Sequence, residues 1–201
     1  MTEQQSTGQE EQPHEITPKL QALKDAALEI EKYVAAGGWD GPIRVFALVN
    51  AKAALAAAPE LQADLPADIN SDILDSTAND YTLFSVEQEN LPHANSLGEL
   101  LGQIYWPDSV DGAAISVERV ILPASAEIDL PKNESAALNA LQSHPDRQDV
   151  RMVAAYMRSG ETWGALRMRN HDKDSLVLSS ETLLAELCSA LAVTFTDLSA
   201  E

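Results

Sequence analysis

The chain has 201 residues and a formal net charge of −19, with 32 acidic against 13 basic side chains. A chain of this length can bury one sizeable core. The negative field repels nucleic-acid phosphates and anionic membrane surfaces, which excludes both as general partners. The acidity instead favours good solubility or a basic protein partner.

The N-terminal segment carries no targeting signal. Residues 1–16 are polar and rich in Gln and Glu, without the basic start and apolar centre of a signal peptide. No apolar run elsewhere approaches the roughly 18 residues that span a bilayer. We therefore expect a cytoplasmic protein with a disordered acidic tail at 1–16 and a single domain at 17–201.

Capping residues, turn residues and apolar periodicity outline the elements of the first half of the chain. Helices should begin at polar caps and end at glycine or proline, and short apolar runs should form strands. The elements are a helix from Thr17–Pro18 to Gly37–Gly38, a strand at 43–49, a helix from Asn50 to Pro59, an acidic connector at 59–79 and a strand at 81–88.

The second half follows the same rules, with Ser96 and Glu99 at capping-box spacing. Its elements are a helix from Ser96 to Trp106–Pro107, a strand at 113–122, a loop at 123–131, a short helix at 134–142, a β-hairpin within 144–171 and a helix at 181–195. This order predicts an α+β fold. An antiparallel or mixed sheet of about five strands, ending in the late hairpin, should pack against N-terminal and C-terminal helices.

The hairpin holds an unusual share of the basic and aromatic side chains. Ser159–Gly160 reads as a two-residue turn, because glycine supplies the positive φ that such turns need. In that register Tyr156 faces Trp163, and one face of the hairpin gathers a candidate partner-binding patch. The patch consists of Tyr156, Arg158, Trp163, Arg167 and Arg169. The alternative is that a terminal helix covers this face and the arginines extend around it.

The two ends of the hairpin suggest a second kind of site. The stem should bring His144 and Asp146 toward His171 and Asp172, and such side chains bind divalent metals or transfer protons. Their spacing matches no specific metal motif. We treat this cluster as the basis of an alternative function, that of an enzyme or a metal-binding protein.

No specific catalytic motif stands in the chain. GxSxG, Walker and dinucleotide-binding patterns are absent, so we expect no cofactor. His144-Pro145-Asp146 spells the signature of J-domain co-chaperones, but the paired amphipathic helices of that family do not flank it. The single cysteine, Cys188, excludes an internal disulfide and lies in an apolar helical stripe, where it acts as a small hydrophobic residue.

Three stretches of the chain, 37–49, 106–123 and 144–172, resemble a family of uncharacterised actinobacterial proteins. The resemblance covers most of residues 17–195 and implies a single cytoplasmic domain without an established activity. The layout is also similar, more loosely, to secretion-chaperone-like folds, a likeness of fold rather than of function.

The sequence leaves catalysis open but favours a non-enzymatic protein. We expect it to bind another protein or itself through the hairpin face, with a homodimer as one way to bury the basic and aromatic patch against acidic residues of a second copy. A small-molecule-binding domain is a third possibility, which depends on a pocket being present.

Overall fold

The computed structural model describes residues 16–64, 80–122, 133, 140–141 and 143–196. The predicted tail up to residue 15, most of the connector at 59–79, the loop at 123–131 and most of the helix at 134–142 fall outside the described residues. Residues 140, 141 and 143 are helical, in agreement with the end of that predicted helix.

The described strands form one antiparallel sheet of six strands in the order β2-β1-β3-β4-β5-β6. This confirms the α+β class. The strands are β1 (Arg44–Asn50), β2 (Leu83–Glu87), β3 (Gly112–Ile121), β4 (Gln148–Met157), β5 (Thr162–Met168) and β6 (Leu178–Ser180). The helices are α1 (Pro18–Ala36), α2 (Ala51–Ala57), α4 (Leu97–Leu101) and α7 (Ala185–Ala192), with short 3-10 turns η1 (Pro59–Asp64), η2 (Arg169–His171), η3 (Asp174–Leu176) and η4 (Val193–Phe195).

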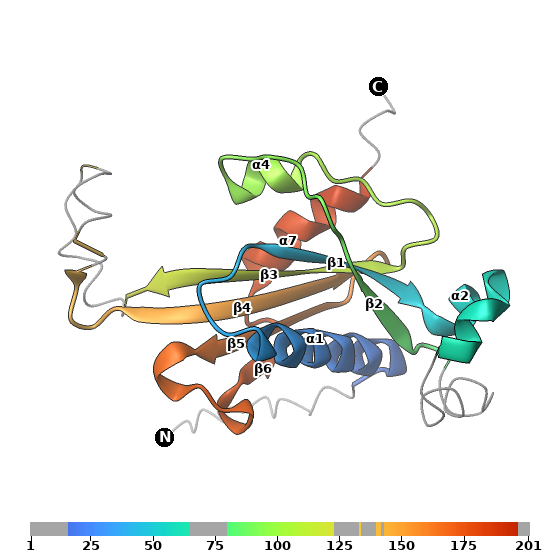
Figure 1. Cartoon of the computed structure of the whole chain (residues 1–201), viewed down its shortest axis with the longest axis horizontal. Coiled ribbons are helices and arrows are strands. Elements are labelled where there is room, and N and C mark those ends of the chain that lie inside the picture. Colours follow the sequence, from blue (N-terminus) through green and yellow to red (C-terminus); the bar gives the residue numbers. More distant parts are fainter. Residues whose placement is uncertain (1–15, 65–79, 123–132, 134–139, 142, 197–201) are drawn as a thin grey trace, which may run out of the picture.

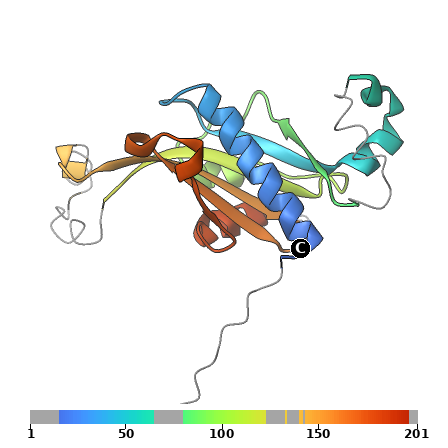
Figure 2. The same ribbon diagram turned by 90° about the horizontal axis from the view of Figure 1, so that it is seen from below.

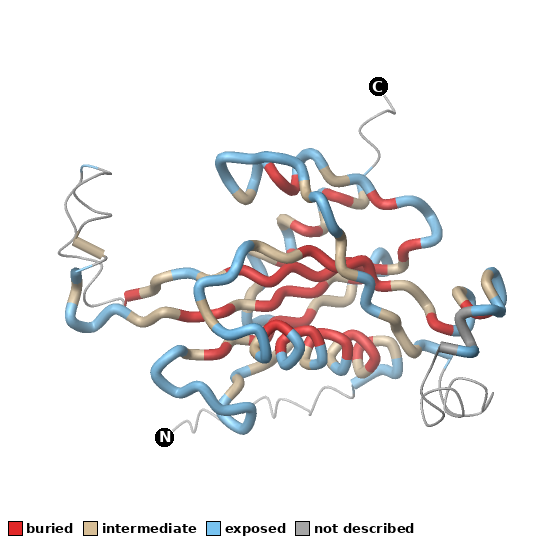
Figure 3. The backbone as a smooth tube through the Cα atoms, in the orientation of Figure 1, coloured by how far each residue is buried: buried red, intermediate tan, exposed pale blue. Residues whose placement is uncertain are grey.

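Helices cover both faces of the sheet (Figure 1). The apolar stripe of α1 packs on one face, with Leu23, Ala27 and Ile30 against Phe46 of β1 and Val153 of β4. Figure 2 shows α1 running diagonally across the strands. On the opposite face α4 and α7 form a second apolar cluster with β1, β3 and β4. The strand centres between the two helical layers are buried, as Figure 3 shows.

The sequence-based capping assignments are confirmed in α1. The Thr17 side chain accepts a hydrogen bond from the backbone N–H of Leu20, and proline stands in the first turn. A helix of 19 residues results, long enough to cross the sheet and to reach the hairpin strands. Among the described residues, no helix has the length and apolar content that crossing a membrane requires.

The C-terminal region differs from the prediction. A short sixth strand, β6, precedes the last helix, and α7 begins at Ala185 rather than near 181. The chain passes close to β5 at Gly164, where an added Cβ would lie 3.0 Å from Leu184. Glycine at this position therefore lets the start of α7 pack directly on the sheet.

Candidate binding sites

The hairpin turn is one residue longer than predicted, and this changes every cross-strand pair. Met157 donates a backbone hydrogen bond to Glu161, and Gly160 adopts a φ of 109° in the three-residue loop between them. Tyr156 therefore pairs with Thr162, and Trp163 pairs with Ala155. Because a shift of one residue reverses the faces, Tyr156 and Trp163 lie on opposite sides of the sheet.

Trp163 and Arg167 are buried under α1. Trp163 is 6% exposed and Arg167 is 3% exposed. The Arg167 guanidinium donates two hydrogen bonds, of 2.6 and 2.7 Å, to the buried carboxylate of Glu31 in α1. It also binds Asp172 at 3.0 Å and Asp174 at 2.7 Å. These bonds, chiefly those to Glu31, raise the pKa of Arg167. Arg167 thus joins α1 to the hairpin.

A second group of side chains surrounds Trp39, in the turn after α1. The guanidinium of Arg151, which is 1% exposed, lies 4.4 Å from the Trp39 ring and binds Glu118 at 2.8 Å. Arg169 lies on the same ring and binds Asp40 at 2.7 Å. The stacked arginines hold this turn against β3 and the hairpin. Their positive charges are paired with acidic side chains of the same chain.

Arg158 also binds groups of its own chain, although this residue is exposed. It donates hydrogen bonds to the carbonyls of Trp106, Pro107 and Val110, and its guanidinium lies 4.9 Å from the Phe195 ring. The prediction that the five patch residues share one exposed face is therefore wrong. Binding of another protein stays a prediction, but it needs a different surface.

The proposed His/Asp cluster does not assemble in the described residues. The ring of His144 accepts a hydrogen bond from the Asp146 backbone N–H within the same turn, and the ring of His171 forms a hydrogen bond with the side chain of its neighbour Asn170. Asp172 accepts from Trp39 at 2.9 Å, and this bond and that from Arg167 lower its pKa. The described part of the chain holds no group of three or more His, Cys, Asp or Glu side chains placed for a metal.

An apolar groove lies on the face of the sheet that α7 only partly covers. Directly paired residues form a row across four strands on this face: Val117, Met152, Leu166 and Leu178. Val117 is buried, whereas Leu178 at the sheet edge is 50% exposed. We call the hollow beside this row the α7 groove. It has a volume of about 600 Å³ and is lined mainly by Leu97, Val117, Met152, Leu183, Leu184 and Leu187.

The α7 groove exists because the two helical layers are unequal. The 19 residues of α1 cover one face, whereas α7 has eight residues and α4 has five. Leu183, at the rim of the groove, is 37% exposed. Large apolar side chains that are contiguous and exposed mark an interaction surface more often than isolated ones do.

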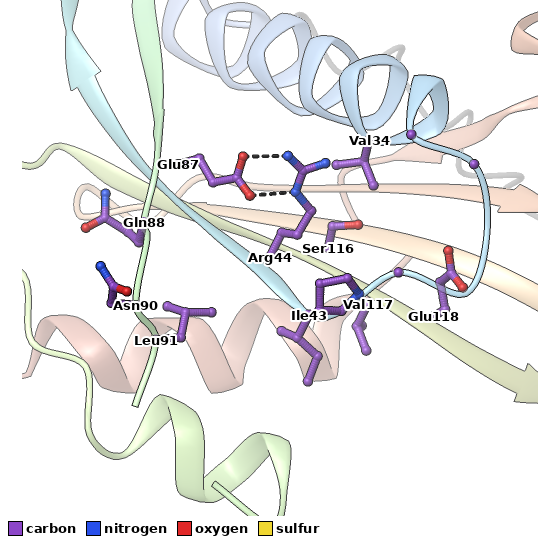
Figure 4. A pocket seen from close by; sticks show the side chains of 14 residues that line it. Val34, Ile43, Arg44, Glu87, Gln88, Asn90, Leu91, Ser116, Val117 and Glu118 are labelled. Atoms are coloured by element: carbon purple, nitrogen blue, oxygen red, sulfur yellow. Dashed lines mark hydrogen bonds and ion pairs between the residues drawn. The ribbon is translucent and has the colours of Figure 1, made fainter. Parts of the chain in front are cut away.

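A second hollow opens at the start of β1, where α1 ends and β2 stops pairing. We call it the β1 pocket; it has a volume of about 530 Å³. In Figure 4, Gln88, Asn90 and Leu91 bound one side of it, and Ile43, Val117 and Glu118 bound the other. The β1–β3 pairing extends to Arg44 and Ser116, beyond the last β1–β2 pair of Phe46 with Glu87.

An ion pair spans the β1 pocket. Arg44 of β1 binds both carboxylate oxygens of Glu87 at 2.5 Å, drawn as dashed lines in Figure 4. Tyr33 of α1 covers the guanidinium, whose centre is 4.6 Å from the ring. The hydrogen bonds from Arg44 lower the pKa of Glu87, and the same bonds raise the pKa of Arg44. Opposite Arg44 on β3, Ser116 is 2% exposed and lines the pocket.

Local sequence patterns do not predict either hollow directly. Arg44 and Ser116 interrupt apolar strands, and a polar residue inside such a run is a signal that could have been followed. Leu183, Leu184 and Leu187 lie within the helix expected at 181–195 and belong to its apolar stripe. Such a stripe does not indicate how much neighbouring surface is available to cover it.

Comparison with known proteins places the chain in one family. It belongs to the PPA1309-like protein family, whose model matches residues 23–196. No curated protein and no solved structure matches the chain.

Proposed function

We propose that this member of the PPA1309-like family is a non-enzymatic, cytoplasmic binding protein of actinobacterial type, and that the α7 groove receives an amphipathic helix of a basic partner protein. The proposal keeps protein binding as the function but moves it from the predicted hairpin patch to the opposite face of the sheet. The observation that carries it is the apolar lining of the groove, where Val117 and Met152 of the sheet face Leu183, Leu184 and Leu187. Beside the groove the same row of the sheet continues through Leu166 to the exposed edge at Leu178.

A helix suits the groove because helices already form this layer. A sheet face that is covered by one short helix leaves apolar area beside that helix, and a second helix packed there would complete the layer. Leu97 of α4 lines the far side, so the groove has a wall on each flank. An incoming helix would present apolar side chains at positions i, i+3, i+4 and i+7.

The charge of the chain selects the polar side of the partner. With a net charge of −19, the protein attracts a segment whose solvent-facing side carries Lys or Arg and repels one that carries Asp or Glu. Glu186 and Arg119 both line the groove, so the preference comes from the whole molecule rather than from one ion pair. Such an attraction weakens as the salt concentration rises.

The test compares two synthetic helices with the same leucine face, each of about 18 residues or roughly five turns. One has lysines and the other has glutamates on its polar face, and fluorescence anisotropy measures their binding to the full chain. We expect the lysine peptide to bind more tightly, by at least about tenfold, which corresponds to about 1.4 kcal/mol. Binding of neither peptide would refute the groove, and equal binding of both would refute the selection by charge.

A matched pair of variants locates the binding. Leu183→Asp places a charge at the rim of the groove, whereas Val193→Asp makes the same kind of change at a side chain that is 52% exposed and lies outside the groove lining. We expect Leu183→Asp to abolish the tighter binding and Val193→Asp to leave it unchanged. Equal effects of the two variants would contradict the assignment. Sedimentation of the wild type tests the competing occupant, a second copy of this chain.

A further inference from the structure

We propose that the β1 pocket is a second binding site, separate from the α7 groove, which takes a small uncharged molecule with hydrogen-bonding groups on one side and an apolar group on the other. The first observation is the hydroxyl of Ser116. This residue is 2% exposed and lines the pocket, and within the described residues its side chain has no hydrogen-bond partner.

A side-chain hydroxyl in a buried residue usually bonds within the protein. The Ser116 hydroxyl is not among the fully enclosed, unpartnered polar atoms of the described residues, so it opens to the pocket. Thr194, equally buried on the other side of the sheet, shows the usual arrangement: its hydroxyl donates to Leu191 at 2.6 Å and accepts from Trp106 at 2.9 Å. Ser116 therefore presents an available donor and acceptor on the floor of the pocket.

Turns beside the pocket place a polar side chain at its mouth. Asn90, which lines the pocket, has a φ of 56°, and Asp40, in the turn above it, has a φ of 66°. Asn and Asp are the residues other than glycine that adopt this left-handed conformation most readily, and they do so in turns. The amide group of Asn90 thereby stands at the mouth of the pocket, across from Ser116 (Figure 4).

The carboxylates that line the pocket are already paired with arginines of the same chain. The pocket therefore favours an uncharged ligand. Glu87 is paired with Arg44, and Glu118 is paired with Arg151 and also accepts from the backbone N–H of Asp40 at 2.8 Å. A charged ligand would have to break one of these pairs or remain uncompensated in a half-enclosed space. An uncharged ligand meets no such penalty.

The remaining groups define the shape of the ligand. Ser116, Asn90 and the carbonyl oxygen of the Gln88 side chain offer hydrogen bonds of both directions, while Val34, Ile43 and Leu91 supply an apolar wall. The volume of about 530 Å³ lies within the usual range for small-molecule sites, roughly 300–1,000 Å³. Small amides and alcohols with an apolar substituent meet these requirements.

The probes are pairs of fragments in which each uncharged amide or alcohol has a carboxylate twin, such as N-acetylleucinamide and N-acetylleucine. Binding to the full chain is followed by the NMR shifts of backbone amides at 37–44, 88–91 and 116–118. We expect uncharged members to shift these amides and their twins to leave them unchanged. If no uncharged fragment shifts them, or if the twins bind equally, the proposal is wrong.

Two variants make the assignment specific. Ser116→Ala should retain the thermal stability of the wild type and lose at least about tenfold in affinity, which is about 1.4 kcal/mol. Ser189→Ala removes an exposed hydroxyl on α7 and should change neither. Unaltered fragment binding by Ser116→Ala would overturn the proposal. Peptide binding in the α7 groove should persist in Ser116→Ala, which keeps the outcomes for the two sites distinguishable.

Discussion

Removing the positive charge of Arg167 should destabilise the fold strongly, because it leaves Glu31 buried without a counter-ion. Glu31 is 2% exposed and receives two hydrogen bonds from Arg167, at 2.6 and 2.7 Å. Breaking a buried pair in this way costs about 3–5 kcal/mol. At roughly 2–4 °C per kcal/mol for a chain of this size, Arg167→Met should lower Tm by about 6–20 °C.

Urea unfolding followed by circular dichroism measures this loss, and a double-mutant cycle separates the pair from other effects. We expect Glu31→Leu combined with Arg167→Met to be less destabilised than the sum of the single variants, because the double variant leaves no buried charge from this pair. Arg169→Met serves as the control, since Arg169 binds Asp40 at the surface, and its loss of stability should be much smaller than that of Arg167→Met.

A loss of less than about 1 kcal/mol in Arg167→Met, below the cost of an unpaired buried charge, would refute this role of the ion pair. Losses of the two single variants that add without coupling would refute it as well. The same variant distinguishes the structural role from the predicted role in a protein interface. An interface residue would change the association state and leave the unfolding curve in place.

Three further predictions use single substitutions. Thr194→Val should cost about 1–3 kcal/mol in urea unfolding, because it leaves the buried N–H of Trp106 without its acceptor; no measurable loss would contradict this. Trp163→Phe should lose less free energy of unfolding than Thr194→Val in the same assay, although phenylalanine has a smaller ring than tryptophan. The reason is that the Trp163 ring nitrogen is buried and unpartnered among the described residues, so its removal breaks no hydrogen bond. Glu87, whose pKa is lowered below its ordinary 4.5 by Arg44, contributes stability that is fully present above pH 4.5 and is lost as the pH falls through the lowered value. Glu87→Gln should therefore lose less stability than the wild type between pH 5 and pH 3, and parallel pH profiles would refute it.

Helices and strands with strong local signals were predictable from the sequence. The side chains that they contact in the fold were not. The cap at Thr17, the apolar stripe of α1 and the turn at Gly160 predicted the first helix and the hairpin, and the structure contains both. The register of the hairpin depended on whether its loop has two or three residues. Because side chains alternate along a strand, that single residue decided whether Trp163 is in the core or in a patch with Tyr156.

The two hollows depend on longer-range geometry. β6 has three residues, too few for an alternating pattern to be recognised. The β1 pocket combines Arg44, Glu87 and Ser116 from three strands, and it lies where the β1–β2 pairing ends before the β1–β3 pairing does. A local pattern predicts where a strand begins and ends, but not which neighbour leaves it uncovered.

The contact between Glu31 and Arg167 joins residues that are 136 positions apart in the chain. During translation at about 5–20 residues per second, roughly 7–27 seconds separate the synthesis of these two residues. The sheet face that α1 covers is built largely from β4 and β5, which leave the ribosome late. The apolar side of α1 can therefore reach its complete packing only after the hairpin has been synthesised.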